Sequence, residues 1–326
     1  MANFNKHVQI GETAAIADGI NSGMIKAAQK NDRIIAVLED MGFPGIGWFK
    51  ENAPHRVIEC GIAEANGAVV AAGLAAEGFV PFIHSFVFAA VGRAFNQIRQ
   101  SILQDRYNVK ILGREGAWGE PGISHNHIEG IGMTRVMPNL VIIDPADIVE
   151  AEKAVMAMAD YIGPVFMKIE ASPSIPKTFT DDYPFDIGKA YVLREGKDAT
   201  IIATGYMLTE AIRAVELLGK DGLDVGVINM STLKPLDDEA VIKAAEETGA
   251  IVTAENGSII GGLGEAVATV LSENMPASLI RVGIEDEFSQ SGRITKEKDE
   301  LKAHFGLGAE DVALSVKECI AKKKRL

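Results

Sequence analysis

Cysteine is nearly absent from this chain of 326 residues, which has only Cys60 and Cys319. Two cysteines so far apart in sequence offer no metal-ligand spacing, and they fit a reducing compartment, which predicts a cytoplasmic protein. No apolar run approaches the length of a membrane span, and the N-terminus lacks the apolar core of a signal peptide. Repeats and low-complexity tracts are absent too. The sequence therefore predicts neither a membrane protein, nor a disulfide scaffold, nor a repeat array.

Positive charge is also scarce. The chain has 32 lysines and arginines against 45 aspartates and glutamates, so its net charge is -13. Such an excess of negative charge disfavours binding to nucleic acid or to an anionic membrane surface. The basic residues 322–325 form a short terminal tail, which we expect to be a solvated helix end. The apolar content of 47% is that of an ordinary globular protein, and the length predicts two domains.

Strand and helix patterns alternate along both halves of the chain. The predicted strands are 33–38, 80–84, 109–112, 140–143 and 164–169, then 199–203, 224–228, 250–254 and 279–282. The predicted helices are 12–29, 63–76, 88–104 and 146–159, then 208–218, 238–247, 264–272 and 295–305. Continuous apolar strands alternating with helices are typical of a parallel sheet covered on both faces. The predicted fold class is α/β, with two domains that each contain a mostly parallel sheet flanked by helices.

A proline-rich polar segment interrupts this alternation at residues 172–186. Proline removes backbone donors and fixes the chain direction, so the segment is predicted to be an interdomain linker. The predicted domains are therefore residues 1–171 and 187–326.

Glu64 stands at the junction of a short apolar segment, 57–61, and a run of small residues, 65–76. This places a carboxyl group at the start of a helix that can pack tightly. An acid in the first helical turn usually serves only as a favourable partner for the helix dipole. Partial burial in such packing would instead suit the group to proton exchange, and the pattern alone leaves both roles open.

The glycine run 261–264 follows a predicted strand and precedes a predicted helix. Its spacing departs from the G-x-G-x-x-G fingerprint of dinucleotide-binding proteins. We therefore expect a structural role for it.

Six segments, in the same order along the chain, resemble the transketolase group of thiamine-diphosphate enzymes. They are Gly-Ile-Ala-Glu-Ala-Asn at 61–66, Pro-Phe-Ile-His-Ser-Phe-Val-Phe at 81–88, Gly-Glu-Pro-Gly-Ile-Ser-His at 119–125, Met-Pro-Asn-Leu at 137–140, Leu-Lys-Pro-Leu-Asp at 233–237 and Ile-Ile-Gly-Gly-Leu-Gly at 259–264. The resemblance covers nearly the whole chain. It implies the C-terminal subunit of a split transketolase, with a pyrimidine-binding domain followed by a transketolase C-terminal domain.

The resemblance implies roles for three residues toward thiamine diphosphate. Glu64 matches the family's glutamate, which exchanges a proton with the pyrimidine ring of the cofactor. Phe88 matches the phenylalanine on which that ring stacks, and Phe86 is its close neighbour. Both phenylalanines could equally be ordinary core residues.

Four further residues are candidates for contact with the substrate. His125 matches the family's histidine that reaches the reacting end of the sugar, where it can donate a hydrogen bond to an oxygen of the intermediate. Glu120 is a second candidate and could also lie at a subunit contact. Arg114 is a third candidate. His127 is the fourth; it has no counterpart in the family and could either line the pocket or merely lie at the surface.

One part of the family's site is missing from the sequence. Family members bind the diphosphate through a divalent metal held by an aspartate in a Gly-Asp-Gly run, and no such run occurs here. The resemblance therefore implies no metal ligands in this chain. It implies an N-terminal partner subunit that carries the diphosphate and Mg²⁺ or Ca²⁺, and an α2β2 assembly with two-fold symmetry.

The groups that usually bind a sugar phosphate are also replaced. The family's positions for two arginines, a histidine and an aspartate correspond here to Ala14, the region of Glu170 and Ala171, Gly113 and Pro121. Because phosphate recognition needs charge-assisted donors, we expect a substrate other than the standard pentose phosphates. Arg114, Arg56 and Lys168 are the candidates to replace the missing donors.

The resemblance implies transfer of a two-carbon ketol unit from a ketose donor to an aldehyde acceptor. Three other readings stay open at this point. The β subunit of a 2-oxoacid dehydrogenase shares both domains, as does deoxyxylulose-phosphate synthase, which is normally a longer single chain. A non-catalytic partner that only scaffolds or regulates a complete enzyme is the other alternative.

Overall fold

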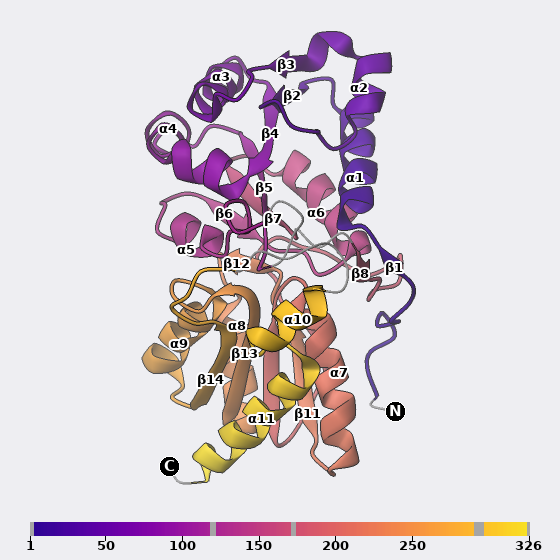
Figure 1. Cartoon of the computed structure of the whole chain (residues 1–326), viewed down its shortest axis with the longest axis vertical. Coiled ribbons are helices and arrows are strands. Elements are labelled where there is room, and N and C mark those ends of the chain that lie inside the picture. The colour runs from indigo at the N-terminus through magenta and orange to yellow at the C-terminus, as the bar shows by residue number, and fades with distance from the viewer. Residues whose placement is uncertain (1–2, 118–121, 171–173, 290–296, 325–326) are drawn as a thin grey trace.

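The computed structural model describes residues 3–117, 122–170, 174–289 and 297–324, which form two α/β units stacked along the long axis of the molecule (Figure 1). The first unit is uppermost in this view and the second lies beneath it. Each unit has a mostly parallel sheet flanked by helices. The predicted fold class is confirmed.

The first sheet has seven strands in the order β12-β6-β7-β5-β4-β2-β3. Six of them are parallel: β2 (Ile34–Leu38), β3 (Val57–Glu59), β4 (Val80–Phe86), β5 (Lys110–Glu115), β6 (Val141–Ile143) and β7 (Val165–Glu170). Every residue of β2 is buried, as a sheet covered on both faces requires. The seventh strand, β12 (Thr232–Lys234), comes from the second half of the chain and pairs antiparallel with β6. The sequence did not predict that a strand from the second half of the chain joins the sheet of the first unit.

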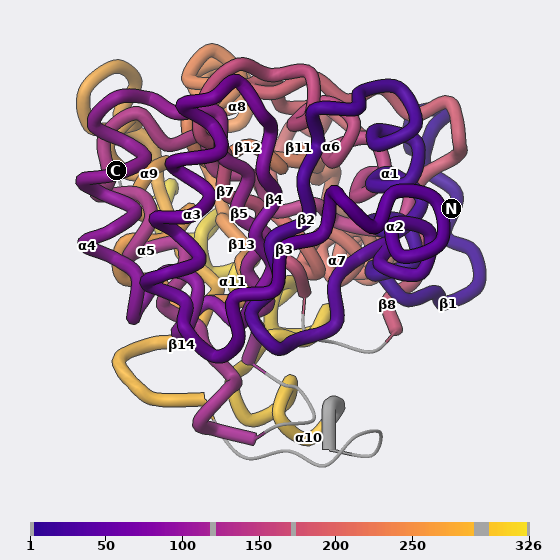
Figure 2. The backbone as a smooth tube through the Cα atoms, turned by 90° about the horizontal axis from the view of Figure 1, so that it is seen from above, coloured from indigo at the N-terminus to yellow at the C-terminus, as the bar shows by residue number. Residues whose placement is uncertain are grey.

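Helices cover both faces of this sheet (Figure 2). On one side lie α1 (Ile16–Lys30) and α6 (Ile148–Asp160), and on the other α3 (Glu64–Ala76). Glycine lets α1 and α6 approach closely, because a Cβ atom at Gly19 would lie 2.0 Å from the carbonyl oxygen of Ile148. Three short elements complete the unit: α2 (Ile46–Asn52), η1 (Pro54–Arg56) and α5 (Gly130–Arg135).

The helix predicted at 88–104 is irregular. Two π-helical segments, η2 (Phe88–Arg93) and η3 (Ile98–Leu103), flank the short helix α4 (Phe95–Gln97). Such wide turns are rare and occur frequently at functional sites. Here η2 buries its alanines and valine and leaves Phe88 half-buried and Arg93 exposed.

The second unit has a five-stranded sheet in the order β14-β13-β10-β11-β9. Its strands are β9 (Tyr191–Arg194), β10 (Ala199–Ala203), β11 (Val225–Asn229), β13 (Ala250–Ser258) and β14 (Ser278–Ile284), and only β9, at one edge, is antiparallel. Its helices are α7 (Met207–Lys220), α8 (Asp238–Thr248), α9 (Leu263–Asn274), α10 (Glu297–His304) and α11 (Ala309–Lys323). Residues 322–324 are exposed at the end of α11, as predicted for the basic tail.

The segment predicted as a linker, 172–186, is packed against both units over its described part, residues 174–186. Strand β8 (Ile175–Pro176) pairs with β1 (Thr13–Ala14). The buried rings of Phe179 and Tyr183 stack with their centres 3.6 Å apart. Asn229 of β11 donates a hydrogen bond to the Tyr183 hydroxyl at 3.0 Å. The segment thus contacts both units. The exact domain boundaries stay a prediction.

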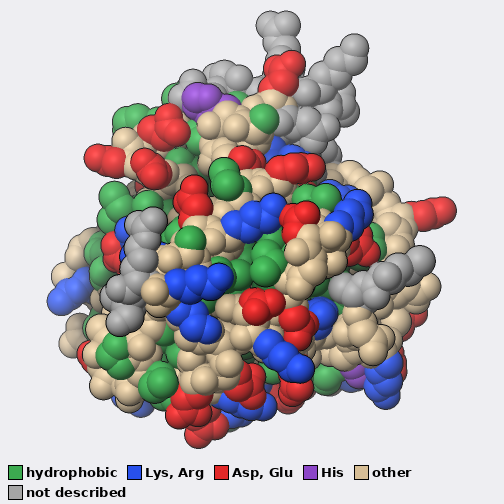
Figure 3. Space-filling view, turned by 90° about the horizontal axis from the view of Figure 1, so that it is seen from below, with side chains coloured by type: hydrophobic (Ala, Val, Ile, Leu, Met, Phe, Trp, Pro, Cys, Tyr) green, Lys and Arg blue, Asp and Glu red, His purple; other side chains and the backbone are tan. Residues whose placement is uncertain are grey.

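Acidic and basic side chains are interspersed over the lower face of the molecule (Figure 3). This face presents no broad basic surface to nucleic acid. Within the described ranges, no helix is both long and apolar enough to cross a membrane.

Candidate functional site

The structure brings most of the predicted site residues together at the carboxyl end of the first sheet. Glu64 is the first residue of α3, and its side chain is only 8% exposed. Arg93 donates a hydrogen bond from Nη1 to Oε1 of Glu64 at 3.0 Å. The carboxyl group is therefore held in place by a cation and almost closed to solvent.

Phe86 ends β4 and Phe88 begins η2, and both rings are half-buried. The rings lie nearly parallel, with their centres 5.8 Å apart and an interplanar angle of 20°. The Arg93 guanidinium carbon is 5.2 Å from the centre of the Phe88 ring. Arg93 thus links Glu64 to a pair of flat aromatic surfaces, which suit a planar heteroaromatic ligand.

His125 meets both phenylalanines edge-on, with each ring centre 4.9 Å from its own. Its Nδ1 atom lies 2.8 Å from the Ser124 hydroxyl, which leaves Nε2 as the other nitrogen available for hydrogen bonding. His127 stacks on Phe88 at 4.9 Å. The predicted roles of His125 and His127 remain untested, although both lie against the aromatic pair.

Glu129 accompanies His127. Nδ1 of His127 lies 3.2 Å from Oε2 of Glu129, and this contact lowers the pKa of the Glu129 carboxyl group. A ring that stacks on Phe88 from the same side would have to compete with this anchored imidazole.

Arg114 lies on β5 with its guanidinium carbon 5.8 Å from the centre of the Phe86 ring. It also lines a cavity of about 260 Å³ between the carboxyl ends of the strands and the start of α1. His84 lines the same cavity, and burial lowers its pKa to about 4. Its Nδ1 atom is 2.6 Å from the carbonyl oxygen of Gly42, so the neutral ring donates its proton there. The cavity is therefore lined by one permanent cation, a neutral imidazole and an acidic residue, Glu170.

The other two basic candidates, Arg56 and Lys168, are buried and bind groups of the protein itself. The expectation that they could replace the missing phosphate-binding donors is therefore corrected. Arg56 is buried and donates to the carbonyl oxygens of Ala28 and Asn31. Lys168 is buried at the boundary between the two units. Glu120 and Pro121, the remaining predicted positions in this loop, lie outside the described residues.

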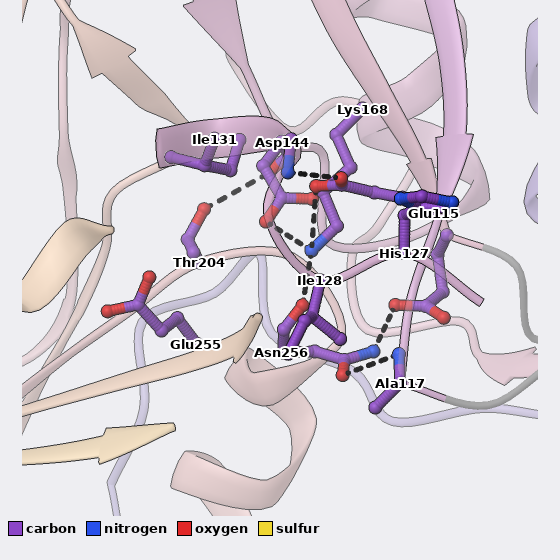
Figure 4. Close-up of polar contacts among 12 residues, drawn as sticks. Glu115, Ala117, His127, Ile128, Ile131, Asp144, Lys168, Thr204, Glu255 and Asn256 are labelled. Atoms are coloured by element: carbon purple, nitrogen blue, oxygen red, sulfur yellow. Dashed lines mark hydrogen bonds and ion pairs between the residues drawn. The ribbon is translucent and has the colours of Figure 1, made fainter. Parts of the chain in front are cut away.

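Lys168 is the centre of a buried polar network that joins the units (Figure 4). Its ammonium group lies 3.5 Å from Asp144 and 3.9 Å from Glu115, and it donates to the carbonyl oxygen of Asn256 at 2.6 Å. Burial raises the pKa of Glu115 to about 8, whereas the surrounding carboxyl groups raise the pKa of Lys168 despite its burial. Lys168 is therefore a charged structural residue, unavailable to a substrate.

The glycine run 261–264 has a structural role too. Glu255 accepts hydrogen bonds from the backbone of Leu263 and Gly264, both at 2.8 Å. A Cβ atom at Gly262 would lie 1.9 Å from Oε2 of Glu255. The chain's own carboxyl group thus fills the start of α9, where a dinucleotide-binding protein would hold phosphate.

Sequence reasoning missed two residues of the site, Arg93 and Glu39. Glu39 directly follows β2, it is buried, and neither of its carboxyl oxygens accepts a hydrogen bond from any described residue. An acid just after an apolar parallel strand was a usable signal, since ligands bind at the carboxyl ends of such strands. Arg93 carried no signal, because an exposed arginine on a helix is ordinary.

Two family models match the chain: the transketolase pyrimidine-binding domain over residues 12–170 and the transketolase C-terminal domain over residues 188–312. The 6-deoxy-6-sulfo-D-fructose transketolase subunit SqwH of Clostridium sp. (strain MSTE9) is 39% identical over 92% of both chains. The chain belongs to the transketolase family. This result favours the transketolase reading over that of a 2-oxoacid dehydrogenase β subunit.

Two further relatives place it among split transketolases. One of the subunits of the apulose-4-phosphate transketolase of Phocaeicola vulgatus is 36% identical, over 92% of this chain and 95% of that one. A solved structure described as "Split gene transketolase, inactive beta4 tetramer" matches with a TM-score of 0.86 and 36% identity, over 95% of this chain and 99% of that one. The chain is accordingly a transketolase-type subunit, and transketolases use thiamine diphosphate.

The residues present fit one half of that cofactor. Paired aromatic rings and an anchored, nearly buried carboxyl group suit an aminopyrimidine. Among the described residues, no group of three or more His, Cys, Asp or Glu side chains could hold a metal ion.

Proposed function

We propose that this chain is the pyrimidine-side subunit of a two-chain transketolase that transfers a two-carbon ketol unit from a ketose to an aldehyde. When bound, thiamine diphosphate supplies a carbanion at its thiazolium ring, which is the chemistry that side chains lack. Glu64 holds and exchanges the proton at the pyrimidine nitrogen N1′, and Arg93 keeps its carboxyl group in position. The observation that carries the proposal is the contact of Arg93 with both Glu64 and Phe88.

The aromatic pair and His125 complete this half of the site. Phe88, with Phe86 beside it, supplies the flat surface that orients the pyrimidine ring. His125, held edge-on between the two rings, donates a hydrogen bond to a substrate oxygen on which charge develops. His127 and Arg114 line the approach to it, and we place Glu120 in the same loop on sequence alone.

The diphosphate half comes from an N-terminal partner subunit, which also binds Mg²⁺ or Ca²⁺. Two lines of support are the absent Gly-Asp-Gly run and the relatives, which are themselves named as subunits. We further propose an α2β2 assembly with two sites. Two free cysteines, one of them buried, agree with a cytoplasmic location.

The substrate is proposed to be a sugar other than the standard pentose phosphates. Of the three basic candidates, Arg114 alone lines the cavity near Phe86. Glu170 lines the same cavity, so its mixed charge suits the hydroxyl groups of a sugar better than a phosphate group. Relatives named for 6-deoxy-6-sulfo-D-fructose and apulose 4-phosphate agree with unusual sugars in this group. Efficient turnover of xylulose 5-phosphate with ribose 5-phosphate would contradict this part of the proposal.

Calorimetry tests the division of the site. Thiamine diphosphate and Mg²⁺ are titrated into the chain alone, into the N-terminal transketolase-like subunit alone, and into their mixture. Tight binding only in the mixture is expected, and a panel of ketose donors and aldehyde acceptors follows. Equal binding by this chain alone would overturn the split site, and no binding in any sample would favour the scaffolding alternative.

A further inference from the structure

Glu39 is a buried acid that the proposed function leaves without a role. The residue is 4% exposed, and neither carboxyl oxygen accepts a hydrogen bond within the described structure. Burial, reinforced by the nearby charge of Glu64, raises its pKa to about 7. The Ser85 hydroxyl group moderates this rise without closing a hydrogen bond of good geometry. A buried, unpartnered carboxyl group costs stability, so its presence calls for a physical reason.

Glu39 lies against the helical turn that Glu64 begins. A Cβ atom at Gly67 would be 2.3 Å from Oε1 of Glu39, so a side chain at this position would displace the carboxyl group from where it lies. Gly67 is three residues after Glu64 on α3, and residues three apart share a helix face. The Glu39 carboxyl group therefore lies against the first turn of α3, close enough to Glu64 for the charge of Glu64 to raise the pKa of Glu39.

The two acids have different charged neighbours. Arg93 pairs with Glu64, while the ionisable groups that affect Glu39 are acidic, namely Glu59 and Glu64. Cys60 also faces it, and burial followed by the charge of Glu39 raises the pKa of that thiol. Among the described residues, the cation thus lies on the Glu64 side of the pair. Glu64 therefore has a cationic partner, whereas the charges that act on Glu39 favour its protonated form.

We propose that Glu39 and Glu64 form a carboxyl pair with one shared proton, in which Glu39 is a positioning residue that stores the proton for Glu64. The exchange is balanced: the protonated Glu39 and ionised Glu64 become the ionised Glu39 and protonated Glu64, with no net change of charge. Because the pair is nearly closed to solvent, Glu64 can be reloaded without waiting for a proton from bulk water. This inference rests on the proposed role of Glu64.

The isolated chain gives the first test, which is independent of cofactor and partner. Infrared spectra of the carboxyl region are recorded from pH 5 to 9 for the wild type, Glu39→Gln and Asp40→Asn. We expect Glu39→Gln alone to lose one protonated-carboxyl component that titrates near pH 7, as seen in the difference spectrum against the wild type, while the component of Glu255, which titrates in the same range, stays. Asp40 is the matched control, since it is the adjacent exposed acid and its left-handed backbone conformation tolerates asparagine.

A second variant tests the coupling without changing Glu39. Removing the neighbouring charge with Glu64→Gln should shift the same titration to lower pH, and an unchanged midpoint would overturn the pair. This measurement remains decisive should Glu39→Gln fail to fold.

The assembled enzyme gives the functional test. With partner, Mg²⁺ and thiamine diphosphate present, we expect Glu39→Gln to slow exchange of the cofactor's C2 proton with deuterated solvent by about tenfold, less than the 100-fold or more typical of losing the acid itself. Cofactor affinity should be unchanged. Wild-type exchange rates and pH profile in Glu39→Gln would overturn the inference and leave the proposed function intact, whereas a wild-type mixture that binds no cofactor would overturn the proposed function alone.

Discussion

Arg93 connects residues from two separate sequence motifs, Glu64 and Phe88, by contacting both. It contacts the carboxyl group of Glu64 at 3.0 Å and lies over the ring of Phe88, although 29 positions in sequence separate it from Glu64. A cation in this position holds the carboxyl group in one orientation. The acid is thereby set against the aromatic surface, and this is the arrangement that proton exchange with a stacked ring requires.

The role of Glu64 is tested by Glu64→Gln, which keeps shape and removes proton exchange. We expect turnover by the assembled enzyme to fall at least about 100-fold, while assembly with the partner, followed by analytical ultracentrifugation, is unchanged. Glu77→Gln is the control, because Glu77 is exposed at the other end of α3. Full activity in Glu64→Gln would reject the proposed function, and lost assembly would assign Glu64 a structural role.

Phe88 and His127 make a contrasting pair. Phe88→Ala should weaken thiamine diphosphate binding by about tenfold, equivalent to about 1.4 kcal/mol of lost stacking. His127→Ala should bind the cofactor at least as tightly as the wild type, because the imidazole now covers the same ring. Calorimetry on the assembled enzyme compares the two variants. Weaker binding by His127→Ala would mean that His127 itself contacts the cofactor.

At the scale of elements, close approach between helices and strands positions the site. Gly19 and Gly23 let α1 contact the backbone of α6, and Gly67 admits Glu39 beneath α3. The wide turns of η2 then direct Phe88 and Arg93 toward Glu64. Small residues are needed at these positions because a side chain there would occupy the space of a neighbouring backbone or carboxyl group.

Two glycine-to-alanine changes test this reading. Gly19→Ala should lower the free energy of unfolding by about 1–3 kcal/mol or more, because its Cβ atom would lie 2.0 Å from the Ile148 oxygen. Gly73→Ala, in the middle of α3 with nothing within 4 Å, should be stabilising by up to about 1 kcal/mol. Urea unfolding measures both. Equal effects would show that helix propensity, and not the contact with α6, decides the outcome.

At the scale of the whole molecule, buried acids join the two units. Glu115 and Glu255 both face Lys168, and Glu150 accepts a hydrogen bond from Asn229 of the second unit at 2.7 Å. Burial raises the pKa values of all three, to about 8 for Glu115 and Glu150 and about 7 for Glu255. These three acids outnumber the buried cations beside them. Some of their carboxyl groups are therefore protonated at neutral pH.

This excess predicts how stability depends on pH. An acid whose pKa is raised by folding binds more protons in the folded state, so its contribution is present below its unfolded pKa and is lost as pH rises through its folded pKa. We expect the Tm to fall by several degrees between pH 5.5 and pH 9. Glu115→Gln should flatten this decline and Glu77→Gln should leave it unchanged, as followed by differential scanning calorimetry. A Tm that rises over this range would contradict the assignment.

Much of the architecture is readable from sequence alone. Continuous apolar strands between amphipathic helices specify parallel sheets, because periodicity reports which faces a segment must bury. Strand 199–203 was predicted to the residue and Glu64 was placed at a helix start, both from local pattern. The family's motifs, kept in order, added Phe88 and His125, and the structure brings their rings together.

Only the tertiary structure decided the remaining features. Arg93 reaches Glu64, Glu39 lies beneath α3, β12 joins the sheet of the other unit, and the segment 174–186 is packed instead of loose. Sequence periodicity describes a segment's own faces, whereas each of these contacts depends on what distant segments place opposite it. The choice among Arg56, Arg114 and Lys168 shows the reason directly. All three are basic in sequence, and burial with backbone or carboxylate partners leaves Arg114 at the cavity.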